Sequence, residues 1–184
     1  MRLSPGYSIA GAACACLCLV AAVTPAAAPS EPVRTLATVQ ELMLTRIDPA
    51  ADFLWDSVAF IASEKGEEDR RPRTAAQWAA VRENALALIR GATDLGIPGR
   101  QVSALHTAPG PGELPAAEIE RRINADPAAF AKRAQVLKSA ALRALKAIDG
   151  KDADALMNAG GVIDEACEAC HVVYWYPQQL QGRK

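Results

Sequence analysis

The stretch that decides the fold is DPAAFAKRAQVLKSAALRALKAIDG, Asp126 to Gly150. Its apolar residues recur at steps of three and four, which is the period of one face of an α-helix; they are Phe130, Ala134, Leu137, Ala141, Leu145 and Ile148. Asp126-Pro127 combines a helix cap with a proline at the first helical position, and Asp149-Gly150 stops the pattern. We therefore predict one long amphipathic helix here.

Elsewhere in the chain, the same periodicity predicts three further long helical segments. They cover residues 33–63, 74–95 and 152–174, and a short helical piece covers 116–124. Within the first segment, Asp48-Pro49 predicts a kink or a restart with Asp48 as the cap. Glu64–Arg73 is polar and is expected to be a solvated loop, and Gly99–Pro115 is too rich in glycine and proline for regular structure.

No stretch alternates with a period of two, so we expect no strands. Four amphipathic helices with two short links and one long link predict an all-α protein, an antiparallel four-helix bundle. Half of the 184 residues are apolar, which is enough for one domain with a core. The formal net charge of −1 and the lack of a basic stripe argue against a nucleic-acid-binding protein.

The first 28 residues are typical of a cleaved signal peptide. Arg2 precedes an apolar run from Ile9 to Val23, and three alanines end at Ala28, where we expect cleavage. The alternative is an uncleaved anchor, but the apolar run is short for a bilayer span. Residues 29–184 would then form a single exported domain with no stable membrane span, in the periplasm of a Gram-negative cell. Only two cysteines, Cys167 and Cys170, would remain after cleavage.

These two cysteines belong to CEACH, Cys167 to His171, on the last predicted helix. Residues three apart on a helix project on nearly the same side, so both thiols could bond the vinyl groups of one porphyrin edge. The adjacent His171 would ligate the iron, and this spacing is a c-type haem attachment motif. The alternatives are a thioredoxin-like dithiol, a structural zinc site that would also need His106, and an accidental cysteine pair.

A second axial ligand has to come from upstream, because residues 172–184 contain no methionine or histidine. Met157 lies about 21 Å from His171 along the axis of the same predicted helix, which is too far. His106 is either a solvated loop residue or a ligand carried by that loop. Met43, on the apolar stripe of the first segment, is either the distal ligand or ordinary core packing. Arg46, one turn later, is a surface residue or a contact for a haem propionate.

The chain resembles the class II cytochromes c, the cytochrome c-prime and cytochrome c-556 family. The resemblance rests on the signal peptide, the four helical segments, Trp78 early in the second of them, and the continuous segment from Ala128 to the CEACH motif near the C-terminus. It implies one covalent haem c inside a left-twisted bundle, held by Cys167 and Cys170 and ligated by His171. One departure is Trp175, which stands where the family often carries an arginine.

The two branches of this family imply different functions. In the c-556 branch a methionine at the place of Met43 is the sixth ligand, and the protein carries single electrons. In the c-prime branch that position does not ligate, and the five-coordinate iron binds nitric oxide or carbon monoxide. We expect an exported monohaem electron carrier whose partner is an unidentified redox protein, and the alternative is the gas-binding protein. A homodimer is common in the family, whereas an enzyme is not expected, since no acid–base pair or activated nucleophile is recognisable.

The aromatic segment Tyr174–Pro177 follows the motif directly. It is interpreted as a hydrophobic plug at the end of the bundle or as a docking patch for the redox partner.

Overall fold

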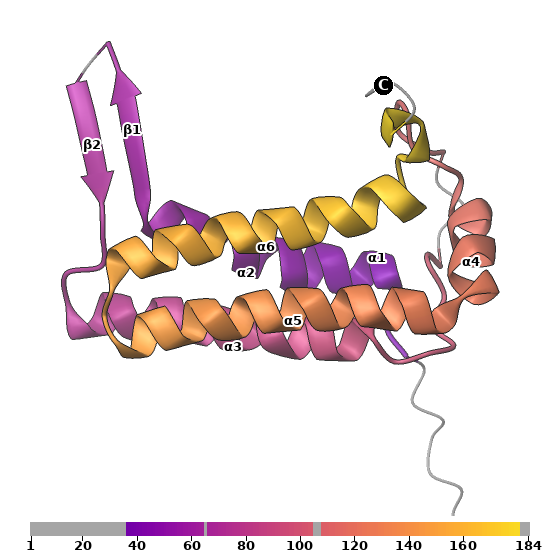
Figure 1. Ribbon diagram of the computed structural model, residues 1–184, viewed down its shortest axis with the longest axis horizontal. Helices are drawn as coiled ribbons and strands as arrows, with labels where there is room; N and C mark the ends of the chain where they lie inside the picture. The colour runs from indigo at the N-terminus through magenta and orange to yellow at the C-terminus, as the bar shows by residue number, and fades with distance from the viewer. Residues whose placement is uncertain (1–35, 65, 105–107, 181–184) are drawn as a thin grey trace, which may run out of the picture. The chain divides into compact units, whose positions relative to one another are not determined.

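The computed structural model of the chain describes residues 36–64, 66–104 and 108–180. Helices carry most of these residues, which confirms the predicted predominance of helix (Figure 1). The first helical stretch comprises α1 (Val39–Leu42), a π-helical turn (Met43–Ile47) and α2 (Asp48–Ser57). The later helices are α3 (Ala75–Leu95), α4 (Ala116–Ala125), α5 (Pro127–Asp149) and α6 (Ala153–Tyr174), and a 3₁₀ turn follows at Pro177–Leu180.

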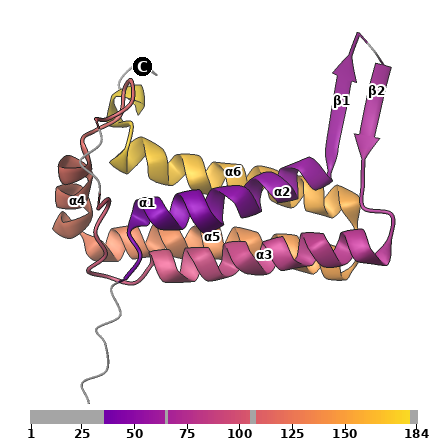
Figure 2. The same cartoon turned by 180° about the vertical axis from the view of Figure 1, so that it is seen from behind.

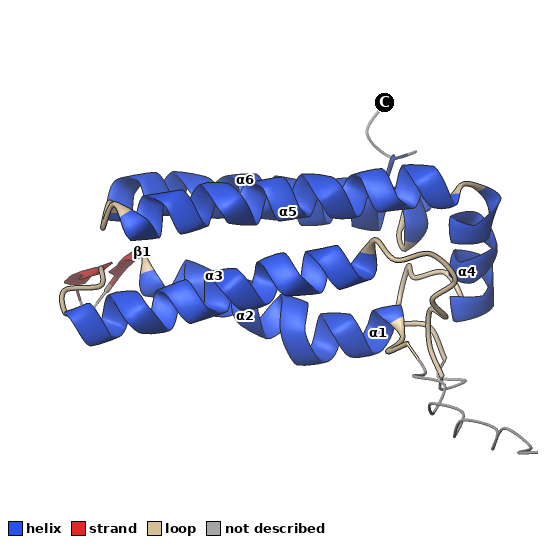
Figure 3. Ribbon diagram, turned by 90° about the horizontal axis from the view of Figure 1, so that it is seen from below, coloured by secondary structure: helices blue, strands red, loops and turns tan. Residues whose placement is uncertain are grey.

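The long helices lie side by side within the unit Thr35–Lys184. Helix α3 packs against α5, α5 packs against α6, and α2 contacts both α3 and α6. The views from the front and from behind show that α2 and α5 run in one direction and α3 and α6 in the other (Figures 1 and 2). The short α4 stands across the ends of the long helices, between α3 and α5 in the chain (Figure 3).

Capping residues fix the beginnings of the long helices, and the sequence predicted one of them, Asp126. The Thr74 hydroxyl accepts the Gln77 N–H, and the Gln77 side chain accepts the Thr74 N–H, which together form a capping box. Asp126 caps α5 and Asp152 caps α6, each through a carboxylate that accepts an amide N–H at 2.9 Å. Such caps stabilise a helix by about 1 kcal/mol each.

The predicted apolar stripes form the core between these helices. Every stripe residue of α5 is buried except the partly buried Leu145. The stripe predicted for α3 is buried throughout; it consists of Trp78, Val81, Ala85, Leu88, Ala92 and Leu95. In α6, Leu156, Ile163 and Tyr174 are buried. The apolar positions predicted for the segment 33–63 run from Leu36 to Ile61, and this stripe is wrong at both ends, because these two residues are exposed at 43% and 38%.

The first helical stretch neither restarts at Asp48 nor uses that residue as a side-chain cap, so of the two predicted alternatives, a kink or a restart, the restart was wrong. The Asp48 N–H donates to the carbonyl of Met43, five residues earlier, and the residue that caps α2 is Ile47, without a side-chain hydrogen bond. Proline lacks an amide hydrogen and its ring crowds the carbonyl four residues before it. The wider π turn gives Pro49 room without breaking the helix.

The prediction of no strands was also wrong, and Gly66–Arg70, within the segment predicted as a solvated loop, is exposed as expected but forms a strand. Strands β1 (Ala59–Ser63) and β2 (Gly66–Arg70) form an antiparallel hairpin in which Ser63 pairs with Gly66 (Figure 3). Four of the five residues in each strand are exposed. Because neither face packs on the helices, the sequence carries no period-two alternation that could signal a strand.

No helix among the described residues combines the length and the apolar character needed to cross a membrane. The predicted signal peptide, residues 1–28, and His106 lie outside the described residues.

Candidate functional site

The candidate site lies on the last turns of α6, where Cys167, Cys170 and His171 stand. Both cysteines are free thiols; Cys170 is buried, with 8% of its surface exposed, and Cys167 is half-buried. His171 is half-buried as well. A helix carries residues three apart on the same side, so the two sulfurs belong to one face.

The structure brings Met43 together with this motif. A small cavity of about 20 Å³ is lined by Met43, Cys167, Cys170 and His171 together with apolar side chains, among them Ile47, Leu95 and Leu137. Met43 and His171 also line a neighbouring cavity of about 250 Å³. The first helical stretch and α6, which are far apart in the sequence, therefore face each other across the site.

The π-helical turn determines which side chains of the first helical stretch line the small cavity. Met43, Ile47 and Asp48 all line the small cavity, which places residues four and five apart on one face. Asp48 lines the larger cavity too. Burial raises the pKa of its carboxyl, and the neighbouring His171 opposes this effect while Asp52 adds to it.

The two thiols lie in a poorly solvated environment. Burial raises the pKa of Cys167 to about 12, and the carboxylates of Asp48 and Asp164 contribute to the shift. Burial raises the pKa of Cys170 to about 11, which the guanidinium of Arg133 partly opposes. Both groups are therefore neutral thiols near pH 7 in the chain without a bound group.

Arg133 is a site residue that sequence reasoning missed. It belongs to α5, its Nη1 donates to the Ala169 carbonyl at 2.6 Å, and it lines the small cavity beside Cys170. It thus places a cation next to the motif from a neighbouring helix. The sequence does place Arg133 directly before the buried stripe residue Ala134. A long side chain beside such a stripe can extend to the edge of the core, and this could have indicated a role at the site.

The aromatic segment closes one side of the larger cavity. The rings of Trp175 and Tyr176 approach that of His171 edge-on, with centroids 5.9 and 6.2 Å away. The Tyr176 hydroxyl donates to Glu113 at 3.2 Å, and the Leu114 N–H donates to the Trp175 carbonyl at 3.0 Å. These bonds attach the segment after α6 to the long connection before α4.

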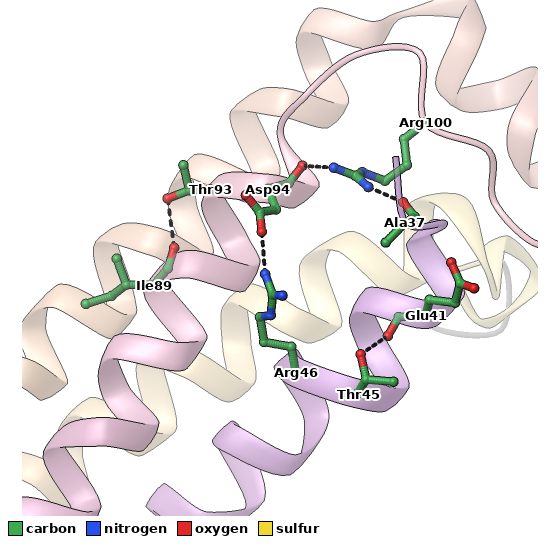
Figure 4. Close-up of polar contacts among 8 residues, drawn as sticks. All are labelled: Ala37, Glu41, Thr45, Arg46, Ile89, Thr93, Asp94 and Arg100. Carbon is green, nitrogen blue, oxygen red and sulfur yellow. Dashed lines mark hydrogen bonds and ion pairs between the residues drawn. The ribbon is translucent and has the colours of Figure 1, made fainter. Parts of the chain in front are cut away.

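A polar cluster fixes the first helical stretch against α3 (Figure 4). The Asp94 carboxylate accepts from Arg46, and the Asp94 carbonyl accepts from Arg100 at 2.8 Å. Arg100 also donates to the Ala37 carbonyl. Arg46, the candidate propionate contact, is therefore engaged by Asp94 in this structure.

The other candidates do not join the site. Met157 lies on α6 with 36% of its surface exposed and lines neither cavity. In residues 36–64, 66–104 and 108–180, no three His, Cys, Asp or Glu side chains are grouped so that they could hold a metal ion.

The residues around the small cavity suit a covalently bound haem in the chemistry of their donors. Two thiols stand one helical turn apart and an imidazole follows the second, while a thioether faces them from another helix. Their surroundings are largely apolar, as a porphyrin requires. Comparison of the chain with models of protein families, with curated proteins and with solved structures gave no match.

Proposed function

We propose that this protein is an exported monohaem c-type cytochrome that carries single electrons, built as an antiparallel four-helix bundle of the class II kind. The observation that carries the proposal is that Met43 lines one cavity together with Cys167, Cys170 and His171, which belong to a different helix. A motif that occurred by chance would not require an apolar cavity beside both thiols or a methionine across from the histidine.

Each residue of the site has a distinct role in this proposal. Cys167 and Cys170 would hold the haem through thioether bonds, His171 would ligate the iron from α6, and Met43 would ligate it from the first helical stretch. The haem would supply a one-electron iron couple. Methionine and histidine ligation would raise the reduction potential of this couple and close the iron to gases. The partner would be a redox protein in the periplasm.

A five-coordinate, gas-binding protein is the second candidate, because Met43 also packs against the hydrophobic core. A methionine in this position needs no metal to explain its burial. The two candidates agree on Cys167, Cys170 and His171 and differ only in the role of Met43.

The first experiment tests the haem itself. The full chain is produced with the cytochrome c maturation machinery, and the intact mass and the pyridine haemochrome spectrum of the exported protein are measured. We expect one added haem and a spectrum of the thioether type, and both should be lost in the variant Cys167→Ala/Cys170→Ala. An exported wild-type chain without added haem mass would refute the proposal.

The second experiment separates the two candidates by the absorption spectrum of the reduced protein with and without carbon monoxide. An electron carrier should be low-spin and unaffected by the gas, and Met43→Ala should make it high-spin and responsive. Met157→Ala is the matched control, because it removes an exposed methionine outside the site. A wild-type spectrum that already responds to carbon monoxide would favour the gas-binding candidate.

A further inference from the structure

The charge around the CEACH motif depends on a neighbouring helix. Helix α6 itself carries acidic side chains and no lysine or arginine; the acidic residues are Asp154, Asp164, Glu165 and Glu168. The first helical stretch contributes one arginine, Arg46, but the Asp94 carboxylate of α3 pairs with it. A cation that acts on the motif therefore has to come from another element.

Arg133 supplies this cation from α5, which packs against α6 (Figure 1). Among the described residues that line the small cavity, Arg133 is the only lysine or arginine and Asp48 is the only carboxylate. The 2.6 Å hydrogen bond from its Nη1 to the Ala169 carbonyl holds the guanidinium against the last turns of α6. The ion pairs within residues 36–64, 66–104 and 108–180 do not include Arg133, so no carboxylate there cancels its charge directly.

The charge of Arg133 already acts on side chains at the motif. Burial raises the pKa of Cys170 and of Tyr174, and the guanidinium of Arg133 opposes the rise at both residues. Charges at the boundary of a core are screened by salt much less than charges on the open surface. The electrostatic effect of Arg133 therefore extends to the place where the second thiol would hold the haem.

We infer that Arg133 raises the reduction potential of the haem iron, an inference that rests on the proposed function. One-electron reduction from Fe(III) to Fe(II) lowers the positive charge of a haem by one unit, and the electron comes from the redox partner, which is oxidised. A fixed positive charge nearby disfavours the more positive, oxidised state. Arg133 thus favours reduction through its charge, without ligating the iron.

Asp48 faces the same cavity from the first helical stretch and has the opposite effect. A carboxylate at this place favours the oxidised state, so the two residues work against each other. The effect of either charge is independent of Met43, because it acts on the iron whether or not a sixth ligand is bound. The inference therefore applies to the electron carrier and to the gas-binding candidate alike.

The test compares reduction potentials of the haem-bearing wild-type protein and its variants by spectroscopic redox titration at pH 7. Arg133→Gln keeps a side chain that can donate to the Ala169 carbonyl but removes the charge. At an effective dielectric constant of about 20, a unit charge about 12 Å away changes such an equilibrium about tenfold. We expect Arg133→Gln to lower the equilibrium constant for reduction by about this factor, Asp48→Asn to raise it, and Arg133→Lys to stay close to the wild-type value.

Lys132→Gln is the matched control, because it removes the same charge from the adjacent, exposed position of α5, which lines neither cavity of the site. At an ionic strength of about 0.15 M, where exposed charges are screened beyond about 8 Å, it should leave the potential near that of the wild-type protein.

Equal potentials in the wild-type and Arg133→Gln proteins would overturn the inference. So would an Arg133→Lys protein with the potential of Arg133→Gln, because the effect would then come from the shape of the guanidinium and not from its charge. A chain that takes up no haem would refute the proposed function and this inference together, whereas equal potentials in haem-bearing proteins would refute this inference alone.

Discussion

Gly91 of α3 provides a sharp test of how the first helical stretch is positioned. A Cβ at this residue would lie 2.7 Å from Cγ1 of Ile47. Carbon atoms in contact prefer about 3.5–4.0 Å. Ile47 is only 1% exposed and cannot turn into solvent. Gly91→Ala would therefore push on the turn that also carries Met43.

The expected change in the free energy of unfolding of Gly91→Ala follows from two opposing effects. Overpacking a buried site costs about 1–3 kcal/mol, whereas replacing a mid-helix glycine by alanine gains about 1 kcal/mol in helix propensity. Gly91→Ala should thus lower the free energy of unfolding by about 1 kcal/mol in total. Gly161→Ala in α6 is the matched control, because nothing lies within 4 Å of the added Cβ. It should raise the free energy of unfolding by about 1 kcal/mol.

Urea unfolding followed by circular dichroism measures both variants, and the approximately 2 kcal/mol between them should appear as about 4–8 °C in melting temperature. A double-mutant cycle then identifies the contact. Ile47→Ala alone should cost about 2–5 kcal/mol, but in that background Gly91→Ala should become neutral or stabilising. If Gly91→Ala stabilises the wild-type chain as much as Gly161→Ala does, the close approach of α3 to the π turn is wrong.

Two further predictions concern the thiols and the contact between α2 and α6. The raised pKa values of Cys167 and Cys170 mean that the folded haem-free chain holds the thiol protons more tightly than the unfolded chain does. In the unfolded chain the pKa of a cysteine thiol is about 8.5. The contribution of the two thiols to the free energy of unfolding is complete below that pH and is lost as the pH rises toward 11. Over this pH range, the free energy of unfolding should therefore fall less in Cys167→Ala/Cys170→Ala than in the wild-type chain. Equal falls in both proteins would contradict the raised pKa values. Trp55→Phe removes the 3.0 Å hydrogen bond from the indole N–H to the Gly160 carbonyl and should cost about 1 kcal/mol in urea unfolding, so an unchanged midpoint would argue against this contact.

The positions of α3, α5 and α6 could be predicted from the sequence, because the signals that determine them are local. The stripe of α5 repeats within one turn, and Thr74, Asp126 and Asp152 cap the amides that follow them directly. The CEACH motif is equally local, because its chemistry depends on residues that one helical turn brings together. The stripes, the caps and this motif could therefore be predicted without knowing which distant segments contact each other.

Other features depend on contacts between distant segments, which no local pattern encodes. The sequence placed Met43 on an apolar stripe, but only the packing of the first stretch against α6 places it at the same cavity as His171. Arg133 appears on a helix surface until α6 brings Ala169 beside it. The hairpin escaped prediction because its strands bury little, so the free energy that normally enforces alternation in a strand is absent there. The sequence by itself thus determined the later long helices and the CEACH motif, and only the tertiary structure decided what faces that motif, because side-chain packing depends on the whole fold.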